Sequence, residues 1–348
     1  MLIPFLKYNP RLIYRHPEIY EFSKTGSFNS MVRHWRDTYY ERETPHMAYD
    51  RSGTIPHHFE ITGVDRFPDA SGFKTRFRDV VGARCQELLN TGRRLNVMWS
   101  GGIDSTCMLF ALMSVARSQD LLRRIRVICN YNSVLEGGTL FDSLIRDKVA
   151  YILEPTGLRG KLYEPPIDDG RSLYVTGGLG DQLFGRNDHI INYSKEDLER
   201  PWRQMSAGHQ IFLTPAIEAS PRPIKTFYDY LWYYSFNFAW QSVKWHHHFM
   251  IPSRLHPRIL NFYGTEDFQR WSIANDEPAM PGGIETYKWP ARELILELTG
   301  DREYVAKKPK LTSQHAYSKL NWLALTSGGG TLYVRDLDEN PQVILTQE

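Results

Sequence analysis

The sequence has few cysteines, no long apolar run and no excess of one charge. Its three cysteines, Cys85, Cys107 and Cys129, are widely separated and form no C-x-x-C pair, which disfavours both a disulfide framework and a zinc knuckle. No stretch of 18 consecutive apolar residues occurs, so a typical membrane-spanning helix is excluded. We therefore expect a globular protein of the reducing cytoplasm with no membrane partner.

Charge gives no direct indication of a partner. The 42 Lys and Arg residues nearly balance the 40 Asp and Glu residues, for a net charge of +2, and no long run of one sign occurs. This balance does not indicate nucleic acid, although it leaves that partner open. The first residues, Met-Leu-Ile-Pro-Phe-Leu-Lys-Tyr, lack a basic leader and a cleavage site, so we expect an unprocessed chain.

Hydrophobic patterns predict an α/β core with parallel strands. Apolar spacing over 75–90 suits an amphipathic helix, and 95–99 has the pattern of a buried strand. Residues 106–116 form an apolar run that is too long for a strand, which predicts a second helix. Two further strands are expected at 125–129 and 173–176, and this strand–helix–strand order is typical of parallel βαβ units.

The second half of the sequence predicts a mostly helical region and a β-rich tail. Residues 227–249 are dense in Tyr, Trp and Phe and predict a buried helix, and helix is also expected over 291–298. Near the end, 331–334 and 342–345 alternate like strands around a turn, which predicts a hairpin.

The segment 100–105, Ser-Gly-Gly-Ile-Asp-Ser, lies between a predicted strand and a predicted helix. A helix N-terminus presents unpaired N–H groups and positive partial charge to a phosphate. Gly101 and Gly102 let the backbone approach the phosphate oxygens, Ser100 and Ser105 can donate hydroxyls, and the carboxylate before Ser105 can bind the Mg²⁺ of a polyphosphate. We interpret the segment as a pyrophosphate-binding loop, with a simple Gly-Gly turn as the alternative.

Other glycine-rich motifs differ from this one. The segment lacks the Lys and the spacing of G-x-x-x-x-G-K-[ST] and the pattern G-x-G-x-x-G, so it is neither a γ-phosphate-hydrolysing loop nor a dinucleotide fingerprint. Residues 327–330, Ser-Gly-Gly-Gly, precede a strand pattern rather than a helix and are interpreted as a flexible loop.

Four segments together resemble a known family. Residues 100–105 resemble the signature of the N-type ATP pyrophosphatases, and three later segments narrow the resemblance to the synthetase domain of asparagine synthetase and its relatives, including β-lactam synthetase. Residues 176–185, Thr-Gly-Gly-Leu-Gly-Asp-Gln-Leu-Phe-Gly, are similar to the family's Ser-Gly-Glu-Gly-Ser-Asp-Glu-x-Phe-Gly-Gly. Residues 288–292, Lys-Trp-Pro-Ala-Arg, resemble its Lys-x-x-x-Arg, and 308–311, Lys-Pro-Lys-Leu, its Arg-Pro-Lys segment.

The resemblance implies a fold and a domain plan. The expected fold is a parallel-sheet nucleotide-binding domain, HUP-like and of the N-type ATP pyrophosphatase kind, with a mostly helical C-terminal region. This domain would span 73–312, with the sheet core over about 93–190 and the helical part over about 191–312. Residues 1–72 would be an N-terminal extension of unassigned role, and 313–348 a C-terminal tail.

The resemblance also implies site residues, with ATP and Mg²⁺ as cofactors. Asp104 and Asp181 would bind Mg²⁺, Lys310 would balance charge at the α-phosphorus, and Asp181 and Lys288 would join it as catalytic residues. ATP would lie against the strand ends at Trp99 and at 130–131. The residues expected to contact it are Ser100, Gly101, Gly102, Asp104, Ser105, Asn130 and Gly177.

Two departures from the family pattern redirect the expected substrate. Gly178 stands where the family has a glutamate, so aspartate is not expected as the substrate. Residue 2 is Leu2 rather than a cysteine nucleophile, and the residues before the loop are too few for a glutaminase domain. A free amine or ammonia is therefore expected as the acceptor.

Three hypotheses for function follow. The first is an ATP-dependent, AMP-forming ligase that adenylates a carboxylate or amide oxygen and transfers it to an amine or ammonia. The second keeps the loop but modifies a nucleobase or tRNA, which the absence of C-x-x-C disfavours. The third is an ATP-binding module with reduced catalysis.

Remaining features favour structural roles. Consecutive histidines at 246–248 point in different directions on a helix and do not converge on a metal. Asp168 and Asp169 precede a glycine and suit a turn better than a cation site. The aromatic residues over 227–245 suit core packing better than base stacking, and the lysines of 307–310 have a solvated surface patch as their alternative.

Overall fold

A computed structural model describes twelve ranges of the chain, which are 50–54, 64–153, 169–185, 190, 193–205, 214–241, 243–244, 253–274, 286–307, 321–327, 330–336 and 342–344. Lys310 and the histidines at 246–248 lie outside these ranges, as does Asp168.

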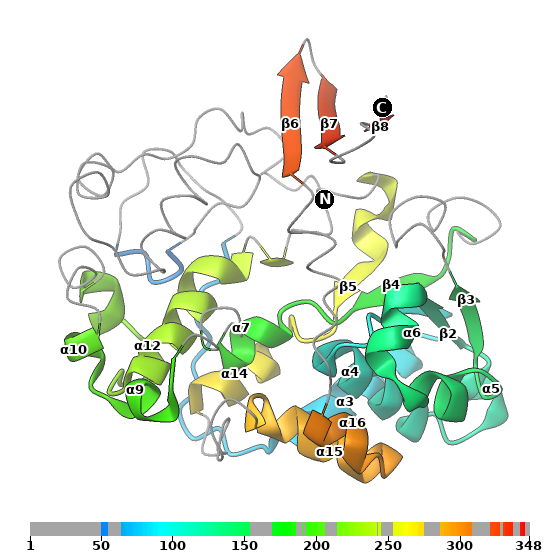
Figure 1. Cartoon of the computed structure of the whole chain (residues 1–348), viewed down its shortest axis with the longest axis horizontal. Helices are drawn as coiled ribbons and strands as arrows, with labels where there is room; N and C mark the ends of the chain where they lie inside the picture. The colour runs from blue at the N-terminus through cyan, green and yellow to red at the C-terminus, as the bar shows by residue number, and fades with distance from the viewer. Residues whose placement is uncertain are drawn as a thin grey trace.

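The first part of the described chain alternates strands and helices (Figure 1). In chain order these elements are α3 (Phe77–Asn90), β1 (Leu95–Met98), α4 (Ile103–Val115), α5 (Gln119–Leu122), β2 (Ile125–Cys129), α6 (Tyr131–Gly137), the π-helix η3 (Phe141–Ile145), β3 (Ala150–Leu153), β4 (Leu173–Thr176) and α7 (Gly180–Phe184).

The later part is mostly helical and ends in short strands (Figure 1). Its elements are α9 (Lys195–Glu199), α10 (Trp202–Met205), α12 (Phe227–Tyr234), the π-helix η5 (Ser235–Ala239), the 3₁₀-helix η6 (Ser253–Arg258), β5 (Ile259–Asn261), α14 (Glu266–Ala274), α15 (Trp289–Thr299), α16 (Arg302–Lys307), β6 (Asn321–Ser327), β7 (Gly330–Asp336) and β8 (Gln342–Ile344).

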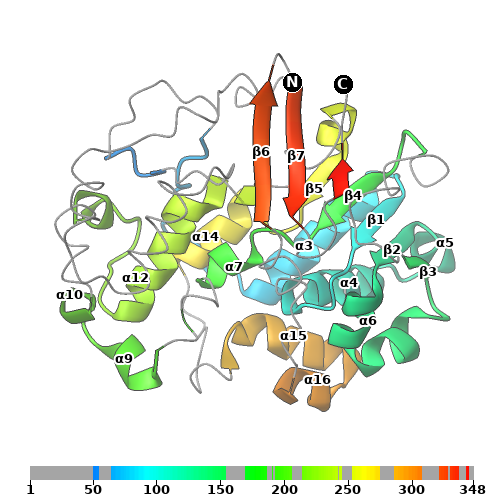
Figure 2. The same cartoon turned by 45° about the horizontal axis from the view of Figure 1, so that its top comes forward.

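Five strands form one parallel sheet in the order β3-β2-β1-β4-β5 (Figure 2). Every neighbouring pair is parallel, and β1 is aligned with both neighbours so that Met98 faces Ile128 on one side and Thr176 on the other. The prediction of an α/β fold with parallel strands is confirmed. Strands β1, β2 and β4 lie within a residue of their expected bounds, whereas β3 and β5 were not expected.

The two faces of the sheet carry different sets of apolar residues. Because side chains alternate along a strand, Leu95 and Val97 of β1 face the main core, while Met98 belongs to a smaller cluster on the opposite face. That smaller cluster also contains Tyr174 of β4 and Leu255 of η6. All residues of β1 and β4 are buried, as are those of β2 except Arg126, which explains the near-continuous apolar sequence of these three strands.

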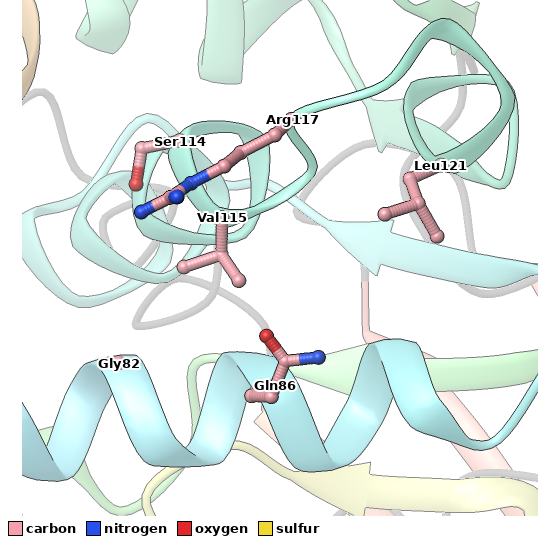
Figure 3. Close-up of a pocket in the computed structure, with 6 residues that line it drawn as sticks. All are labelled: Gly82, Gln86, Ser114, Val115, Arg117 and Leu121. Atoms are coloured by element: carbon pink, nitrogen blue, oxygen red, sulfur yellow. The ribbon is translucent and has the colours of Figure 1, made fainter.

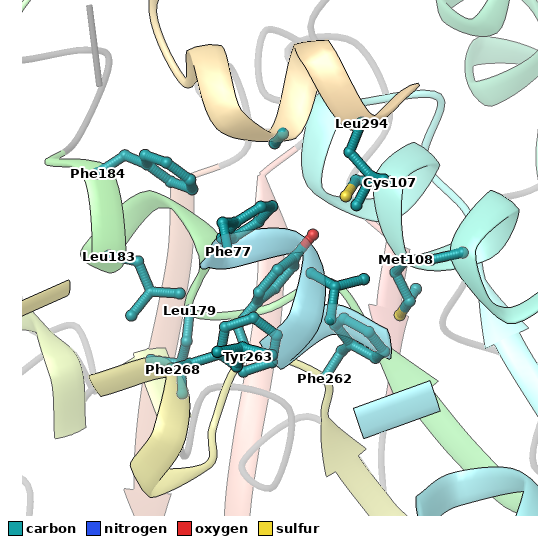
Figure 4. Close-up of a cluster of buried hydrophobic side chains, with 14 of the residues drawn as sticks. Phe77, Cys107, Met108, Leu179, Leu183, Phe184, Phe262, Tyr263, Phe268 and Leu294 are labelled. Atoms are coloured by element: carbon teal, nitrogen blue, oxygen red, sulfur yellow. The ribbon is translucent and has the colours of Figure 1, made fainter. Parts of the chain in front are cut away.

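Helices α3, α4 and α15 pack together on the main-core side of the sheet (Figures 1 and 2). Helix α4 is buried on nearly all sides from Cys107 to Leu112, which is why its apolar run has no amphipathic period. In Figure 4, Leu294 of α15 lies beside Cys107 of α4, and Phe77 of α3 lies between this helix and Phe184 of α7. The three cysteines are free and buried, and burial raises the pKa of Cys107 to about 12.

The order of the strands creates a switch point between β1 and β4. From β1 the chain passes outward to β2 and β3, and then crosses to β4 and β5 on the other side. In open α/β sheets, ligands bind at the carboxyl ends of the two strands where the order reverses. The segments that follow Met98 and Thr176, which are aligned partners in the sheet, leave it at this point.

The aromatic segment forms a helix beside the sheet, as its composition predicts. Helix α12 continues directly into η5, and both are buried. Rings stack along the segment, for example Trp232 on Phe236 with their centroids 5.0 Å apart. Core packing of these aromatics is thus confirmed as far as residue 241.

Part of the predicted N-terminal extension packs on this helix. The backbone N–H of Arg51 donates to Asn237 Oδ1 at 2.8 Å, and Asn237 Nδ2 donates to Asp50 Oδ1 at 2.8 Å. The Arg51 guanidinium lies 4.7 to 4.8 Å from the ring centroids of Phe67, Phe236 and Trp240. Asp50 and Arg51 are therefore buried against the helical region.

A separate sheet has the order β6-β7-β8 and is antiparallel. Strands β7 and β8 form the predicted hairpin, with Val334 facing Val343. The preceding strand β6 was not predicted; its last residue, Ser327, faces Gly330, so the glycine-rich segment 327–330 joins two strands. No helix among the described residues is both long and apolar enough to cross a membrane.

Candidate functional site

The segment 100–105 connects β1 to the first turn of α4 at the switch point. Gly102 is the N-cap of α4, and Asp104 and Ser105 lie in its first turn. Gly101 has a φ of +77°, which a residue without a Cβ adopts readily. The predicted strand–turn–helix context is therefore present, with the positive end of a 13-residue helix at the carboxyl edge of the sheet.

The Ser100 and Ser105 hydroxyls form hydrogen bonds within this loop. Ser105 Oγ donates to the Gly102 carbonyl at 3.1 Å and accepts from the Ser100 N–H at 3.1 Å. Ser100 Oγ lies 3.0 Å from Ser105 Oγ and accepts from the Gly102 N–H at 3.3 Å. The two serines therefore hold the loop in shape.

Neighbouring elements hold the loop backbone from outside. A Cβ on Gly101 would lie 2.4 Å from the Ser133 carbonyl oxygen of α6, so only glycine fits there. The Tyr304 hydroxyl of α16 lies 2.9 Å from the Gly101 carbonyl oxygen, and the Tyr263 hydroxyl donates to the Asp104 carbonyl at 2.9 Å. The loop backbone is therefore held on several sides.

The centre of the site is a lysine between two aspartates. Lys288 Nζ lies 2.5 Å from Asp104 Oδ2 and 2.6 Å from Asp181 Oδ1. The lysine side chain is only 4% exposed, whereas those of Asp104 and Asp181 are 18% and 41% exposed. The structure thus brings together three of the predicted residues, from α4, α7 and the start of α15.

Lys288 is held in a costly backbone conformation. Its φ of 60° and ψ of 40° are left-handed, and it is the N-cap of α15, with a proline in the first turn. For a residue with a Cβ this conformation costs about 1–2 kcal/mol. Burial acts to lower the pKa of Lys288, but the Asp104 and Asp181 carboxylates outweigh it and raise that pKa, so the lysine is charged at neutral pH.

A second left-handed residue lies in the segment that carries Asp181. Leu179, the N-cap of α7, has a φ of 75°, at the position where the resembling motif has glycine. The Leu179 side chain is 1% exposed and belongs to the main core (Figure 4). Burial of an apolar side chain worth about 2–3 kcal/mol exceeds the cost of the strained backbone, so leucine is tolerated there.

Glycines allow the two halves of the site to touch. A Cβ on Gly177 would lie 3.0 Å from the backbone nitrogen of Ser105, and a Cβ on Gly180 would lie 2.3 Å from the carboxyl carbon of Asp104. Lys288 holds that carboxylate in place, so it has little freedom to move away. Asp104 can therefore occupy this position only because residue 180 is a glycine.

Gly180→Ala is expected to destabilise the protein by about 1–3 kcal/mol, because the added methyl group overlaps the Asp104 carboxylate. Gly82→Ala is the matched control, since a Cβ there meets nothing within 4 Å and Gly82 lies inside α3. That variant is expected to gain about 0.5–1 kcal/mol. Urea unfolding of both variants tests the pair, and equal stabilities would contradict the close approach.

Gly178, which stands at the family's glutamate position, lies against Asn261 at the end of β5. A Cβ on Gly178 would lie 2.5 Å from Asn261 Oδ1, which accepts from the Thr176 hydroxyl at 2.8 Å. Asn261 Nδ2 donates to the Lys244 carbonyl at 2.9 Å. A neutral amide network lies at this position, and a Cβ on residue 178 would displace the Asn261 amide from it.

Other predicted nucleotide contacts have structural roles. Asn130 Oδ1 accepts from the Ser133 N–H at 2.8 Å and caps α6, so its side chain is engaged in the helix. Trp99 is fully buried, with its ring against Gly137 and stacked on Phe141, and offers no surface to a base. The backbone ends of β1 and β2 are what remain for a nucleotide at this edge.

The remaining candidates of the sequence lie away from this site. Asp169 Oδ1 accepts from the Arg171 and Ser172 N–H groups, which confirms a turn role for this aspartate.

A surface pocket of about 580 Å³ lies between α3 and the end of α4 (Figure 3). Ser114, Val115 and Arg117 line it at the opposite end of α4 from the loop, roughly 20 Å away for a 13-residue helix.

Several residues of the site carry no sequence signal that we recognised. Tyr287 OH lies 3.4 Å from Asp181 Oδ1 and bonds the Gly185 carbonyl. Asn261 is the last residue of the unpredicted strand β5 and Tyr263 follows it, while Tyr304 lies in α16, far from the loop in sequence. Only Tyr287 could have been found, because it directly precedes the lysine of the Lys-x-x-x-Arg segment.

The donor set of this site suits Mg²⁺ better than a metal enclosed by protein ligands. Among the residues that the structure describes, no three His, Cys, Asp or Glu side chains converge as metal ligands. Mg²⁺ is commonly bound by one or two carboxylates together with substrate phosphates and water. Asp104 and Asp181 already face one cation, the Lys288 ammonium, which shows that a positive charge fits between them.

Comparison of the chain with protein-family models, with curated proteins and with solved structures gave no match.

Proposed function

We propose that this chain is an ATP-dependent, AMP-forming ligase of the asparagine synthetase type. One observation carries the proposal: Asp104, from the loop after β1, and Asp181, after β4, converge at the switch point beside a helix N-terminus. A triphosphate needs this combination of N–H donors and metal-binding carboxylates. The strand order and the loop context also support the HUP-like, N-type ATP pyrophosphatase version of the α/β fold.

The proposed reaction has two steps. An oxygen of the substrate carboxylate, or of an amide, attacks the α-phosphorus of ATP and forms a bond to it, while the bond between the α- and β-phosphates breaks and pyrophosphate leaves. The nitrogen of an amine or ammonia then attacks the activated carbon, forms the new C–N bond and releases AMP. Holding both reactants in one site supplies much of the acceleration.

The residues have distinct proposed parts in this reaction. The loop N–H groups and α4 bind the phosphates, Asp104 and Asp181 would hold Mg²⁺, and Lys288 brings a positive charge to the same point. Bound Mg²⁺ would neutralise charge on the polyphosphate and stabilise the leaving pyrophosphate. Lys310, which lies outside the described residues, keeps its predicted part in balancing charge at the α-phosphorus.

The surroundings of Gly178 bear on which acid the proposed ligase would accept. Because Gly178 and Asn261 present a neutral amide where the family has a carboxylate, the amino group of aspartate has no counter-charge from this position. We therefore propose a small-molecule acid other than aspartate, joined to a free amine or ammonia. We also propose the cytoplasm as the compartment, supported by the three free thiols.

The test is exchange of labelled pyrophosphate into ATP by the full chain with Mg²⁺. A panel of carboxylic acids is added one at a time, and hydroxylamine serves as the amine in a parallel reaction. We expect exchange that depends on one acid, AMP without ADP as the nucleotide product, and a hydroxamate of that acid. ADP as the sole product would refute the ligase, and ATP binding without any turnover would favour the binding module.

A further inference from the structure

Lys288 occupies the position between Asp104 and Asp181 that a metal ion would take. Its Nζ lies 2.5 and 2.6 Å from one oxygen of each carboxylate, and its side chain is almost fully buried. The Tyr287 ring lies beside the ammonium, with its centroid 5.4 Å away. The ammonium therefore pairs with both carboxylates at once.

The backbone is set to keep the lysine there. Lys288 adopts a left-handed conformation that glycine would adopt with less strain. It also begins α15, which is anchored in the core by Ala291 and Ile295. Strained backbone conformations cluster at functional sites, which indicates that the position of the Lys288 side chain matters for function.

Metal affinity in proteins depends on the number of negative charges among the ligands. A divalent ion that arrives alone has to displace an ammonium that already pairs with both carboxylates. A triphosphate changes this balance, because its oxygens offer the ammonium new partners and add ligands for the metal. Metal and nucleotide are then expected to bind together, with each raising the affinity of the other.

We propose that Lys288 is a resident counter-cation that keeps divalent metal out of the site until a nucleotide is present. The nucleotide half of this inference rests on the proposed function, whereas the exclusion of metal by the lysine does not. An enzyme with this arrangement would bind Mg²⁺ only as part of its complex with ATP.

The direct test is Mn²⁺ binding to the full chain without nucleotide, followed by electron paramagnetic resonance. Lys288→Met removes the positive charge. Lys288→Gly removes it as well, and glycine adopts the left-handed backbone conformation with less strain. We expect both variants to bind Mn²⁺ at least tenfold more tightly than the unchanged protein, with one ion per chain. The gain should disappear when Lys288→Met is combined with Asp181→Asn.

Lys244→Met is the matched control. Lys244 Nζ also pairs with an aspartate, at 2.6 Å from Asp65 Oδ2, and this ion pair does not involve Asp104 or Asp181. This variant is expected to bind Mn²⁺ as weakly as the unchanged protein. If Lys288→Met does not fold, Lys288→Gly provides the same comparison, and unchanged Mn²⁺ affinity in the folded variant would overturn the proposal.

A second titration separates this proposal from the proposed function. With α,β-methylene-ATP present, the unchanged protein is expected to bind Mn²⁺ at least tenfold more tightly than without it. Tighter metal binding by Lys288→Met combined with no effect of the analogue would keep the counter-cation and reject the ATP site. Acid-dependent pyrophosphate exchange combined with no gain from Lys288→Met would keep the ligase and reject the counter-cation.

Discussion

Asp181→Asn is expected to lower acid-dependent pyrophosphate exchange by about 10³-fold or more. Asparagine keeps the size of the side chain but removes the negative charge that would hold Mg²⁺ against the polyphosphate, a contribution of several kcal/mol to the transition state. The fold should persist, because Asp181 is 41% exposed and Lys288 keeps its contact with Asp104. We expect a stability loss of only about 1 kcal/mol by thermal unfolding.

Two further variants make this result specific. Asp104→Asn should cause a similar loss of exchange, because its carboxylate faces the same point from α4. Asp142→Asn is the control, since this aspartate of η3 is 65% exposed and pairs with Arg146, the C-cap of that helix. Exchange at the unchanged rate in Asp181→Asn would show that its carboxylate does not bind the reacting metal.

The loop and its strands could be predicted because their signals are local. The turn from β1 through Gly101 and Gly102 into α4 is encoded in consecutive residues, and the three buried strands β1, β2 and β4 are apolar runs with clear ends. The turn at Asp169 is also local, because its carboxylate accepts from the N–H groups of Arg171 and Ser172, two and three residues later.

The strands β3 and β5 were missed for a physical reason. Strand β5 has only three residues, and β3 lies at the edge with exposed Tyr151. Neither has a run long enough to stand out from loop sequence, so pairing with β4 and β2 is what makes them strands. Residues that depend on β5, such as Asn261 and Tyr263, could not be placed without it.

The cluster at the site was predicted only as separate parts. The resemblance nominated Asp104, Asp181 and Lys288, yet nothing in their spacing indicates that the lysine lies between the two carboxylates. That geometry arises from the packing of α15 on α4, over 180 residues apart in the chain, as the separation of 184 between Lys288 and Asp104 shows. Sequence patterns report such contacts poorly, because they are set by the tertiary fold.

The packing of Asp50 and Arg51 gives a structural role to part of the N-terminal extension, for which the sequence predicted none. The Arg51 guanidinium is 1% exposed and donates to the carbonyls of Asp65 and Phe236 at 2.9 and 2.8 Å. It also bonds Gln269 of α14 and lies over three aromatic rings. Burial lowers the pKa of Arg51 to about 9, so the group is still charged at neutral pH. One side chain thus joins the extension to η5 and α14.

Arg51→Met is therefore expected to destabilise the protein by about 3–5 kcal/mol, since it removes the cation from its aromatic contacts and leaves buried carbonyls without their donor. The melting temperature should fall by on the order of 10 °C. Arg51→Lys keeps the charge but not the planar fork, and should recover only part of the loss. Arg123→Met, at a position that is 77% exposed, should stay within about 0.5 kcal/mol of the unchanged protein. A loss that small for Arg51→Met would mean that residues 50–54 are dispensable to the helical region. The larger loss would move the start of the folded unit from residue 73 to residue 50.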